Sequence, residues 1–276
     1  MAPIRVAESD DPRLALYSGV RDPDLLRAHG AFVAEGRLVV ERLFTQSRFP
    51  ARSVLVTPAA HASLAAVLDS AKCPVYLVEP DVMQHITGFH IHRGCLAIGN
   101  RDESLGFEQV ARLHPGPLVC LEAVGNPDNV GGVFRNAAAF GASGVVLSPG
   151  CSDPLYRKSI RTSMGATLVV PFAFASEWPA AISWLRDEGW TVVALTPAED
   201  ARDIRSLGAP SEAGVALLLG HEGTGLSHEA QRMASVRLRI PTTSVVDSLN
   251  VTSAAAIALY AVHAGTVSQP PPDSQR

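Results

Sequence analysis

The sequence predicts a two-part α/β protein, with a small N-terminal α/β unit and a C-terminal, mostly parallel sheet that has helices on both faces. Apolar runs rich in β-branched residues alternate with helical patterns, which is typical of a parallel sheet covered on both sides. The polar stretch RDESLGFEQVARLHPG, residues 101–116, ends in Pro and Gly and divides the chain. With 276 residues and 47% hydrophobic content, the chain can bury a core.

The N-terminal unit is expected between Phe32 and about Asn100. Short apolar runs alternate there with helical stretches, in the order FVAEG, RLVVERLF, SVLVTP, HASLAAVLDSA, PVYLVEP and GCLAIGN. We assign residues 21–106 to this domain, residues 1–20 to an N-terminal extension and residues 107–115 to a linker.

The C-terminal domain is assigned to residues 116–266. Several apolar runs in it have the length and composition of strands: 117–124, 143–150, 167–174, 190–197, 214–220 and 236–241. Helical patterns such as SEWPAAISWLRDEG and SLNVTSAAAIALYAVHAG accompany them. Ligands of such sheets bind beyond the carboxyl ends of the strands, so the loops that follow the strands are candidate sites. The Pro-rich, polar tail 267–276 is expected to be disordered.

The charge balance excludes a protein that binds nucleic acid through a global basic field. Lys and Arg total 23 against 27 Asp and Glu, which gives a net charge of -4. Any contact with RNA must therefore be local. Arg157, Lys158 and Arg161 gather in the stretch YRKSIR, for which a solvated helix face is the alternative interpretation.

The cysteines and apolar segments indicate a cytoplasmic protein. Cys73, Cys95, Cys120 and Cys151 lie far apart without C-x-x-C spacing, so we expect reduced thiols in the core. The N-terminal stretch MAPIRVAESDDPRLAL lacks the apolar segment of a signal peptide. No stretch approaches the ~18 apolar residues of a membrane span.

Three segments of the C-terminal domain are rich in Gly, Pro, Asn or Ser where a strand ends or a helix begins. They are NPDNVGGVFRNAAAFG (126–141), LLLGHEGTGLS (217–227) and IPTTSVVDSLNVTSAAA (240–256). A glycine-rich turn after a strand lets the main chain approach a ligand closely. Each glycine alone could simply end a strand or cap a helix, but three such loops in one domain favour a shared site.

The common phosphate-binding motifs are absent from GHEGTGLS. This stretch has neither the G-x-G-x-x-G spacing of a dinucleotide site nor the Lys-Ser/Thr end of a P-loop. A nucleotide-dependent oxidoreductase or phosphotransferase is therefore disfavoured. His221 and His228 flank this loop without the partner spacing of a metal site, so we interpret them as incidental and expect no metal.

In order, the three segments resemble the signature motifs of the SpoU family, the SPOUT-class RNA ribose 2′-O-methyltransferases that use S-adenosylmethionine. The matching residues are N-P-D-N-V-G-G-V-F-R-N-A, L-L-G-H-E-G-T-G-L and I-P-T-T-S-V-V-D-S-L-N-V-T-S-A. The stretch YRKSIRTSMGATLVVPF is similar to the family's segment between the first two motifs. FVAEGRLVVERLF and RGCLAIGNR are similar to its ribosomal-protein-L30e-like substrate-binding domain.

The resemblance covers roughly residues 25–265 and implies properties that composition and periodicity do not show. It implies a trefoil knot in the C-terminal SPOUT domain, a homodimer whose interface lies near the cofactor, and S-adenosylmethionine as that cofactor. It also implies an RNA partner, rRNA more than tRNA, bound by the L30e-like domain. Asn136 stands where the family often has Thr, and Arg93 where it usually has Gln, which leaves the identity of the RNA open.

The resemblance assigns catalytic roles to Arg135, Asn129, Glu222, Ser248 and Asn250. The arginine is held to activate the 2′-hydroxyl, and because a guanidinium has no acceptor, we expect it to stabilise the developing oxyanion and fix the adjacent RNA phosphate. Asn129 would anchor the loop or hydrogen-bond Arg135. Glu222 would orient Arg135 or the hydroxyl, while Ser248 and Asn250 would hold loop and substrate. The alternatives are a surface salt bridge for Arg135 and helix N-caps for Asn129 and Ser248.

The implied cofactor contacts are mostly backbone amides and carbonyls that surround the adenine. They fall on Gly220, Ile240 and Leu249, with Thr196 after the strand WTVVALTP as a further candidate. Contacts of this kind explain why the matching positions are small or apolar rather than charged.

A second function is also compatible with the sequence. The chain could be a non-catalytic RNA-binding or ribosome-assembly protein that keeps the methyltransferase fold. Such a protein would bind RNA without binding S-adenosylmethionine, so cofactor binding discriminates the two.

Overall fold

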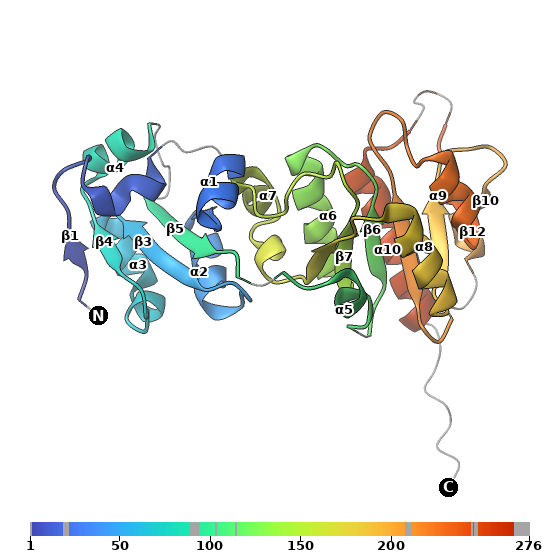
Figure 1. Ribbon diagram of the computed structural model, residues 1–276, viewed down its shortest axis with the longest axis horizontal. Helices are drawn as coiled ribbons and strands as arrows, with labels where there is room; N and C mark the ends of the chain where they lie inside the picture. Colours follow the sequence, from blue (N-terminus) through green and yellow to red (C-terminus); the bar gives the residue numbers. More distant parts are fainter. Residues whose placement is uncertain are drawn as a thin grey trace, which may run out of the picture. The chain divides into compact units, whose positions relative to one another are not determined.

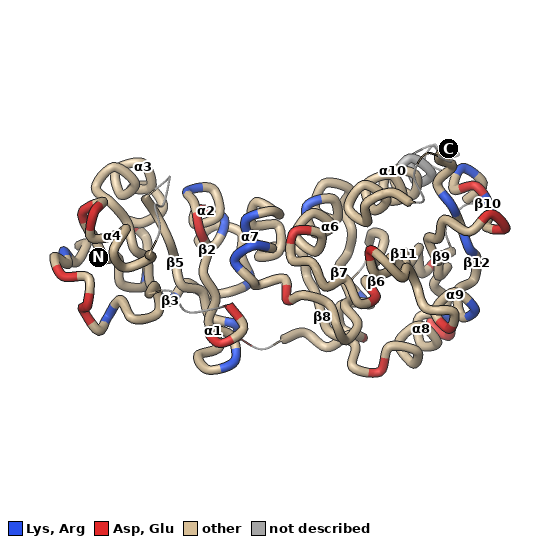
Figure 2. Tube along the Cα trace, turned by 90° about the horizontal axis from the view of Figure 1, so that it is seen from above, with Lys and Arg blue, Asp and Glu red and all other residues tan. Residues whose placement is uncertain are grey.

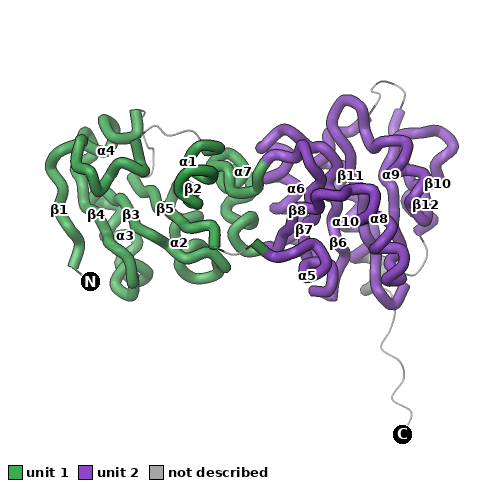
Figure 3. The backbone as a smooth tube through the Cα atoms, in the orientation of Figure 1, with its two compact units in different colours: residues 1–104, 153–169 green, residues 105–152, 170–276 purple. Residues whose placement is uncertain are grey.

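The computed structural model describes residues 2–18, 22–88, 94–102, 104–113, 115–207, 211–243, 245 and 248–267. The chain forms two compact units (Figure 3). Unit 1 comprises residues 1–104 and 153–169, and unit 2 comprises residues 105–152 and 170–276. The chain therefore passes from one unit to the other three times.

Unit 1 is built on a mixed sheet. Its strands lie in the order β1 (Ile4–Arg5), β4 (Val75–Leu77), β3 (Ala51–Val56), β5 (Cys95–Asn100) and β2 (Ala31–Glu35). β5 is antiparallel to both β2 and β3, whereas β1 and β3 run parallel to β4. Residues 95–99 of β5 are all buried, as expected for a strand with helices on both faces.

The helices of unit 1 come from both parts of its chain. They are α1 (Asp22–His29), α2 (Arg37–Thr45), α3 (Pro58–Leu68), α4 (Pro80–Thr87) and α7 (Arg157–Thr162), together with 3-10 turns at Pro12–Tyr17 and Ala166–Leu168 (Figure 1). α3 begins at Pro58 because the hydroxyl of Thr57 accepts a hydrogen bond from the N–H of Ala60 at 3.4 Å.

The N-terminal residues, which the sequence placed in an extension, lie within unit 1. β1 pairs with β4, Leu14 and Tyr17 are buried in the core, and the Tyr17 hydroxyl is 2.8 Å from the Ser53 hydroxyl. A strand of two residues has no periodicity, which is why sequence patterns missed it.

The segment 153–169 also differs from its predicted place in the C-terminal domain, because it packs as part of unit 1. Leu155 and Ile160 are buried, and α7 contacts β2. Arg101 forms a 2.7 Å ion pair with Asp153, and Arg42 donates a 2.8 Å hydrogen bond to the carbonyl of Met164.

Unit 2 contains a seven-stranded parallel sheet. The strand order is β10 (Arg202–Asp203), β12 (Val236–Arg239), β9 (Thr191–Leu195), β11 (Val215–Leu219), β6 (Leu118–Leu121), β7 (Gly144–Leu147) and β8 (Phe172–Phe174). Each recorded pair of neighbouring strands is parallel. All the strand carboxyl ends therefore lie at one edge of the sheet.

Helices cover both faces of this sheet. α5 (Phe107–Ala111), α8 (Trp178–Asp187) and α9 (His228–Met233) share one core cluster with alternate strand residues such as Leu118, Cys120 and Leu218. α6 (Pro127–Ala139) and α10 (Val251–Val267) pack against each other on the opposite side (Figure 2). The predicted α/β class with a mostly parallel, doubly covered sheet is confirmed. The trefoil knot stays a prediction.

Local differences from the predicted elements have identifiable causes. The run 167–174 forms a strand only from Phe172, because Gly165 at φ 83 opens a 3-10 turn and Pro171 has no N–H for a ladder. The predicted linker 107–115 contains α5, which packs on β7 and β8. The tail 267–276 lies outside the described residues except for Val267, and so does Arg93.

The cysteines behave as buried thiols. All four are free; Cys73, Cys95 and Cys120 are buried, as expected for thiols in the core, whereas Cys151 is partly buried. Burial raises the pKa of the Cys120 thiol. Among the described helices, none combines the length and apolar character that crossing a bilayer requires.

The contact between α6 and α10 depends on one glycine. A Cβ at Gly132 would lie 2.6 Å from Cγ2 and 2.7 Å from Oγ1 of Thr252, closer than packed atoms approach. The Asn136 side chain crosses the same contact and donates a 2.8 Å hydrogen bond to the Thr252 carbonyl. Gly132 is thus a helix residue retained for close packing.

We expect Gly132→Ala to lower the free energy of unfolding by about 1–3 kcal/mol, because the new methyl group must push α10 away from α6. Thermal unfolding monitored by circular dichroism measures the loss. Gly125→Ala is the matched control, since its Cβ would find its nearest neighbour at an ordinary 3.8 Å. In Gly132→Ala/Thr252→Ala the loss should be smaller than the sum of the single losses, and strict additivity would contradict the steric explanation.

Candidate functional site

A pocket opens at the carboxyl ends of β9, β11 and β12. Its volume is about 470 Å³, and it is lined by residues from the end of each strand, Leu195, Leu219 and Ile240 among them. This is the edge of a parallel sheet at which ligands are expected, and the volume lies within the ~300–1,000 Å³ of small-molecule sites.

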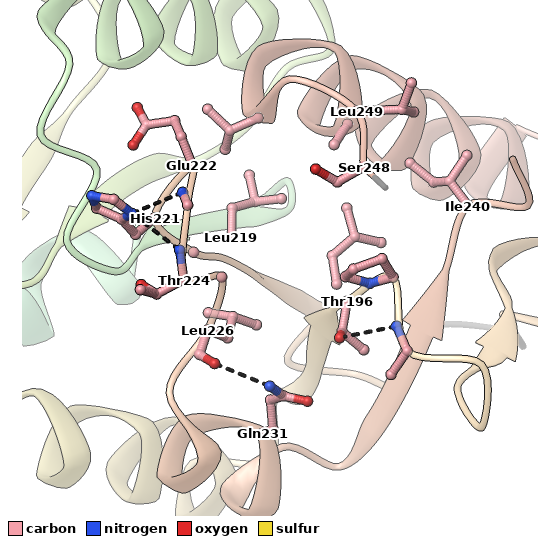
Figure 4. Close-up of a pocket in the computed structure, with 18 of the residues that line it drawn as sticks. Thr196, Leu219, His221, Glu222, Thr224, Leu226, Gln231, Ile240, Ser248 and Leu249 are labelled. Atoms are coloured by element: carbon pink, nitrogen blue, oxygen red, sulfur yellow. Dashed lines mark hydrogen bonds between the residues drawn. The ribbon is translucent and has the colours of Figure 1, made fainter. Parts of the chain in front are cut away.

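The four predicted cofactor residues all line this pocket. Thr196 follows β9, Gly220 follows β11, Ile240 follows β12, and Leu249 precedes α10. Figure 4 shows Ile240 and Leu249 on one side of the cavity. Two predicted catalytic residues, Glu222 and Ser248, line the same pocket.

Gly220 has no room for a side chain. A Cβ there would lie 2.3 Å from the carbonyl carbon of Gly225 and from the nitrogen of Leu226, which are main-chain atoms. The loop after β11 therefore folds back onto its own start, and a 2.9 Å hydrogen bond from the N–H of Gly225 to the His221 carbonyl closes it.

Further hydrogen bonds define the shape of this loop. The Nδ1 atom of His221 accepts bonds from the N–H groups of Gly223 at 2.9 Å and Thr224 at 3.3 Å (Figure 4). At the far end, the Glu122 carboxylate after β6 accepts a 2.9 Å bond from the N–H of Ser227, the N-cap of α9. The loop is thus fixed to the neighbouring strand as well as to itself.

A chain of side-chain hydrogen bonds joins the three glycine- and asparagine-rich segments. Asn129 in α6 donates from Nδ2 to Oε1 of Glu222 at 2.7 Å and accepts at Oδ1 a 3.0 Å bond from Nδ2 of Asn250. Asn129 is buried, whereas Glu222 and Asn250 are exposed at the loop surface. The three segments therefore converge on Asn129.

The helix-cap alternatives can now be decided. Asn126 is the N-cap of α6, where its side chain accepts from the N–H of Asp128 at 2.9 Å, so Asn129 lies inside the helix and caps nothing. The Asn250 side chain accepts from the N–H of Thr252 at 2.8 Å at the start of α10. Asn250 therefore has the capping position that the sequence considered for Ser248.

Arg135 does not take part in the side-chain hydrogen bonds that join Asn129, Glu222 and Asn250 in the described part of the chain. It is exposed on α6 and does not line the pocket. At ~100° per residue, its side chain leaves the helix about 120° around from Asn129, so neither Asn129 nor Glu222 of the same chain holds it. No hydrogen bond or ion pair of its guanidinium is recorded among the described residues.

Sequence patterns missed the residues that support the end of β6. Ala123 adopts φ 54, a left-handed conformation that is costly for a side chain, and its N–H donates to the Ser148 hydroxyl after β7 at 2.9 Å. The thiol of Cys151 donates to the Leu121 carbonyl, and burial raises its pKa. These contacts involve main-chain groups, which leave no motif in the sequence. The position of Ala123, Ser148 and Cys151 in loops that follow strands was the sequence feature that could have indicated them.

The pocket suits an uncharged flat group better than a phosphate. Its described lining is largely main chain and apolar side chains, and the single arginine among these residues, Arg237, forms an ion pair with Asp200. Within the described ranges, His, Cys, Asp and Glu form no group of three or more that could hold a metal ion. An adenosyl group, which is uncharged and needs no cationic cradle, fits these walls.

Comparison with known proteins gives one family. The model of the SpoU rRNA Methylase family matches residues 116–260. An uncharacterized tRNA/rRNA methyltransferase from Mycobacterium tuberculosis is 40% identical over 260 residues, which cover 92% of this chain and 90% of that protein. A putative TrmH family tRNA/rRNA methyltransferase from Staphylococcus aureus is 30% identical over 176 residues, 62% of this chain and 70% of that protein.

Solved structures agree with this result. The AdoMet-bound rRNA methyltransferase from Sinorhizobium meliloti is 27% identical, covers 94% of this chain and 97% of its own, and superposes with a TM-score of 0.80. In fold alone, the chain is also similar to the SpoU methyltransferase AviRb from Streptomyces viridochromogenes in complex with AdoMet. That structure superposes with a TM-score of 0.77 at 20% identity, over 94% of this chain and 100% of its own.

We expect Asn129→Asp to make stability fall as pH rises. The variant places a second carboxyl against Glu222, so the folded protein holds a proton there that the unfolded chain releases. Between pH 5 and pH 8, the free energy of unfolding of the variant should fall by about 1 kcal/mol more than that of the unmodified protein. This difference corresponds to ~2–4 °C in Tm. Differential scanning calorimetry at both pH values measures this. In Asn129→Asp/Glu222→Gln the extra pH dependence should vanish, and its persistence would exclude Glu222 as the cause.

Proposed function

This chain belongs to the SpoU rRNA methylase family, and we propose that it transfers a methyl group from S-adenosylmethionine to a ribose 2′-hydroxyl of RNA. The observation that carries the proposal is the convergence of three loops on Asn129 beside a pocket with main-chain and apolar walls. The relatives are named tRNA/rRNA methyltransferases, and a Sinorhizobium meliloti neighbour is AdoMet-bound.

The pocket residues hold and orient the donor in this proposal. S-adenosylmethionine, when bound, supplies an electrophilic methyl group on its sulfonium. Main-chain groups around Gly220, Ile240 and Leu249 would hold the adenosyl part, which is consistent with side chains at these positions that are small or apolar rather than charged. Asn129 holds Oε1 of Glu222, so the second carboxylate oxygen can accept a hydrogen bond from the ribose hydroxyl and orient it.

Arg135 acts from a second copy of the chain in this proposal. Because its guanidinium leaves α6 away from Glu222, it reaches reacting groups in a pocket other than its own. The neighbouring face of α6 and α10 supports a dimer there: Ile257 is 40% and Tyr260 62% exposed, and the Phe140 ring contacts Tyr260. An isologous homodimer would complete two sites at once.

The role of Arg135 is electrostatic. A guanidinium has no acceptor for the hydroxyl proton, so its contribution is to stabilise negative charge as it develops on the ribose oxygen and to hold the neighbouring phosphate. The proton leaves to an acceptor that Arg135 does not supply, such as that phosphate.

The remaining expectations belong to this proposal. We propose rRNA as the substrate rather than tRNA, an L30e-like role for unit 1 in binding it, a trefoil knot in unit 2 and a cytoplasmic location. The alternative, a non-catalytic RNA-binding or ribosome-assembly protein, predicts no heat of binding when S-adenosylmethionine is titrated into the protein.

We expect Arg135→Ala to lose at least about 100-fold in methyl transfer while its affinity for S-adenosylmethionine is unchanged, because its proposed contacts are with the ribose oxygen and the RNA phosphate rather than with the donor. Tritiated-methyl transfer to RNA measures the rate. Dinucleotides that resist alkali identify the ribose as the acceptor, since a 2′-O-methyl group blocks alkaline cleavage. Alkali-sensitive products would contradict ribose methylation.

A mixing experiment tests the action of Arg135 across a dimer. Arg135→Ala supplies an intact pocket, and Leu249→Asp supplies an intact arginine beside a damaged pocket. Mixed dimers of the two inactive variants should recover about a quarter of the unmodified rate, because half of the dimers contain one complete site of two. Failure to recover activity, with mixed dimers demonstrated by native mass spectrometry, would place Arg135 in its own chain's site or outside the site.

We expect Lys158→Ala/Arg161→Ala to raise KM for RNA and to reduce the salt dependence of RNA binding by about two phosphate contacts. Both side chains are exposed around α7 in unit 1, in a chain with an overall charge of -4. Filter binding at several salt concentrations gives the slope, and calorimetry should show unchanged affinity for S-adenosylmethionine. Arg186→Ala/Arg232→Ala, on α8 and α9, removes the same charge elsewhere. Equal effects of the two pairs would exclude α7 as a specific contact.

A further inference from the structure

The loop between β11 and α9 has to hold its shape without regular secondary structure. Residues 220–226 all line the pocket, and Glu222 within them receives the hydrogen bond from Asn129. Whatever fixes this turn therefore fixes both a wall of the pocket and the direction of the Glu222 carboxylate.

His221 supplies the side-chain acceptor within this turn. Its Nδ1 atom receives the N–H of Gly223 at 2.9 Å and the N–H of Thr224 at 3.3 Å (Figure 4). Main-chain amides only donate, so Nδ1 is unprotonated and the hydrogen of the neutral ring is on Nε2. The tautomer follows from the partners.

The ring lies against the main chain that it holds. A Cβ at Gly223 would be 3.4 Å from the Cε1 atom of His221, which leaves little space between ring and turn. The His221 carbonyl also accepts the N–H of Gly225, so this one residue accepts hydrogen bonds from three amides of the turn, those of Gly223, Thr224 and Gly225. Without Nδ1, the amides of Gly223 and Thr224 would turn to solvent and the turn would widen.

We propose that His221 is a positioning residue for the donor pocket: its Nδ1 acceptor fixes the turn that forms the pocket wall and directs Glu222 toward Asn129. This inference rests on the proposed function, because it names the residue that prepares the same pocket for S-adenosylmethionine. It revises the sequence interpretation of His221 as incidental.

The test compares three variants that separate the acceptor from the ring. His221→Ala removes both. His221→Asn keeps an acceptor, since an asparagine oxygen binds the N–H two residues later in an Asx-turn, here that of Gly223. His221→Phe keeps a ring without an acceptor. His29→Ala, an exposed histidine of α1 in unit 1, is the control.

Two measurements are made on the full-length protein. Calorimetry with S-adenosylmethionine should show affinity about tenfold weaker for His221→Ala and His221→Phe, and within about threefold of the unmodified protein for His221→Asn. Hydrogen exchange of the ligand-free protein should show faster exchange over residues 221–225 in the first two variants and nowhere else. Unmodified affinity in His221→Ala would overturn the proposal, and so would His221→Asn binding as weakly as His221→Ala.

The measurements also separate this inference from the proposed function. If the unmodified protein does not bind S-adenosylmethionine, the proposed function fails, and hydrogen exchange alone then decides whether His221 orders the turn. If the unmodified protein binds and exchange is unaffected in His221→Ala, the role of His221 fails while the function stands.

Discussion

Asn129 joins α6 to the two other loops of the site through both ends of one carboxamide. Its Nδ2 binds Glu222 after β11, and its Oδ1 receives Asn250 at the start of α10. Asparagine suits this position because an ionised carboxylate would lack the donor and a hydrophobic residue would lose both bonds. The buried position of Asn129 makes these bonds costly to leave unmade, so the loops are held in a single arrangement.

Around this contact the site is built by close approach of main chain. Gly132 lets α10 reach α6, and Gly220 lets the loop after β11 fold against Gly225 and Leu226. Both glycines have neighbours within 3 Å of where a side chain would begin. The strained conformation of Ala123 at the end of β6 serves the same purpose, since it turns the chain toward α6 within a few residues. The pocket thus takes its shape from backbone geometry more than from side-chain chemistry.

Sequence patterns were sufficient for the long buried strands and the doubly covered sheet, because runs of apolar residues separated by helical patterns are visible in one dimension. The pocket positions Gly220 and Ile240 came from the resemblance to the family motifs, since nothing in the chemistry of an isoleucine marks a binding site. The direction of Arg135 was not predictable in this way, since it depends on the rotation of α6 against α10. The acceptor at His221 was missed for another reason: its partners are main-chain amides, and every residue other than proline has one.

The passage of residues 153–169 into unit 1 limits how the two units can be exchanged between proteins. Leu155 and Ile160 are buried and α7 contacts β2, although strands β7 and β8 on either side of this segment belong to unit 2. Cutting the chain once near residue 104 would not release an intact unit 1. A chimera that replaced only the N-terminal stretch would expose the apolar side of α7 to water. Recombination can therefore transfer this architecture only when both segments of unit 1 move together.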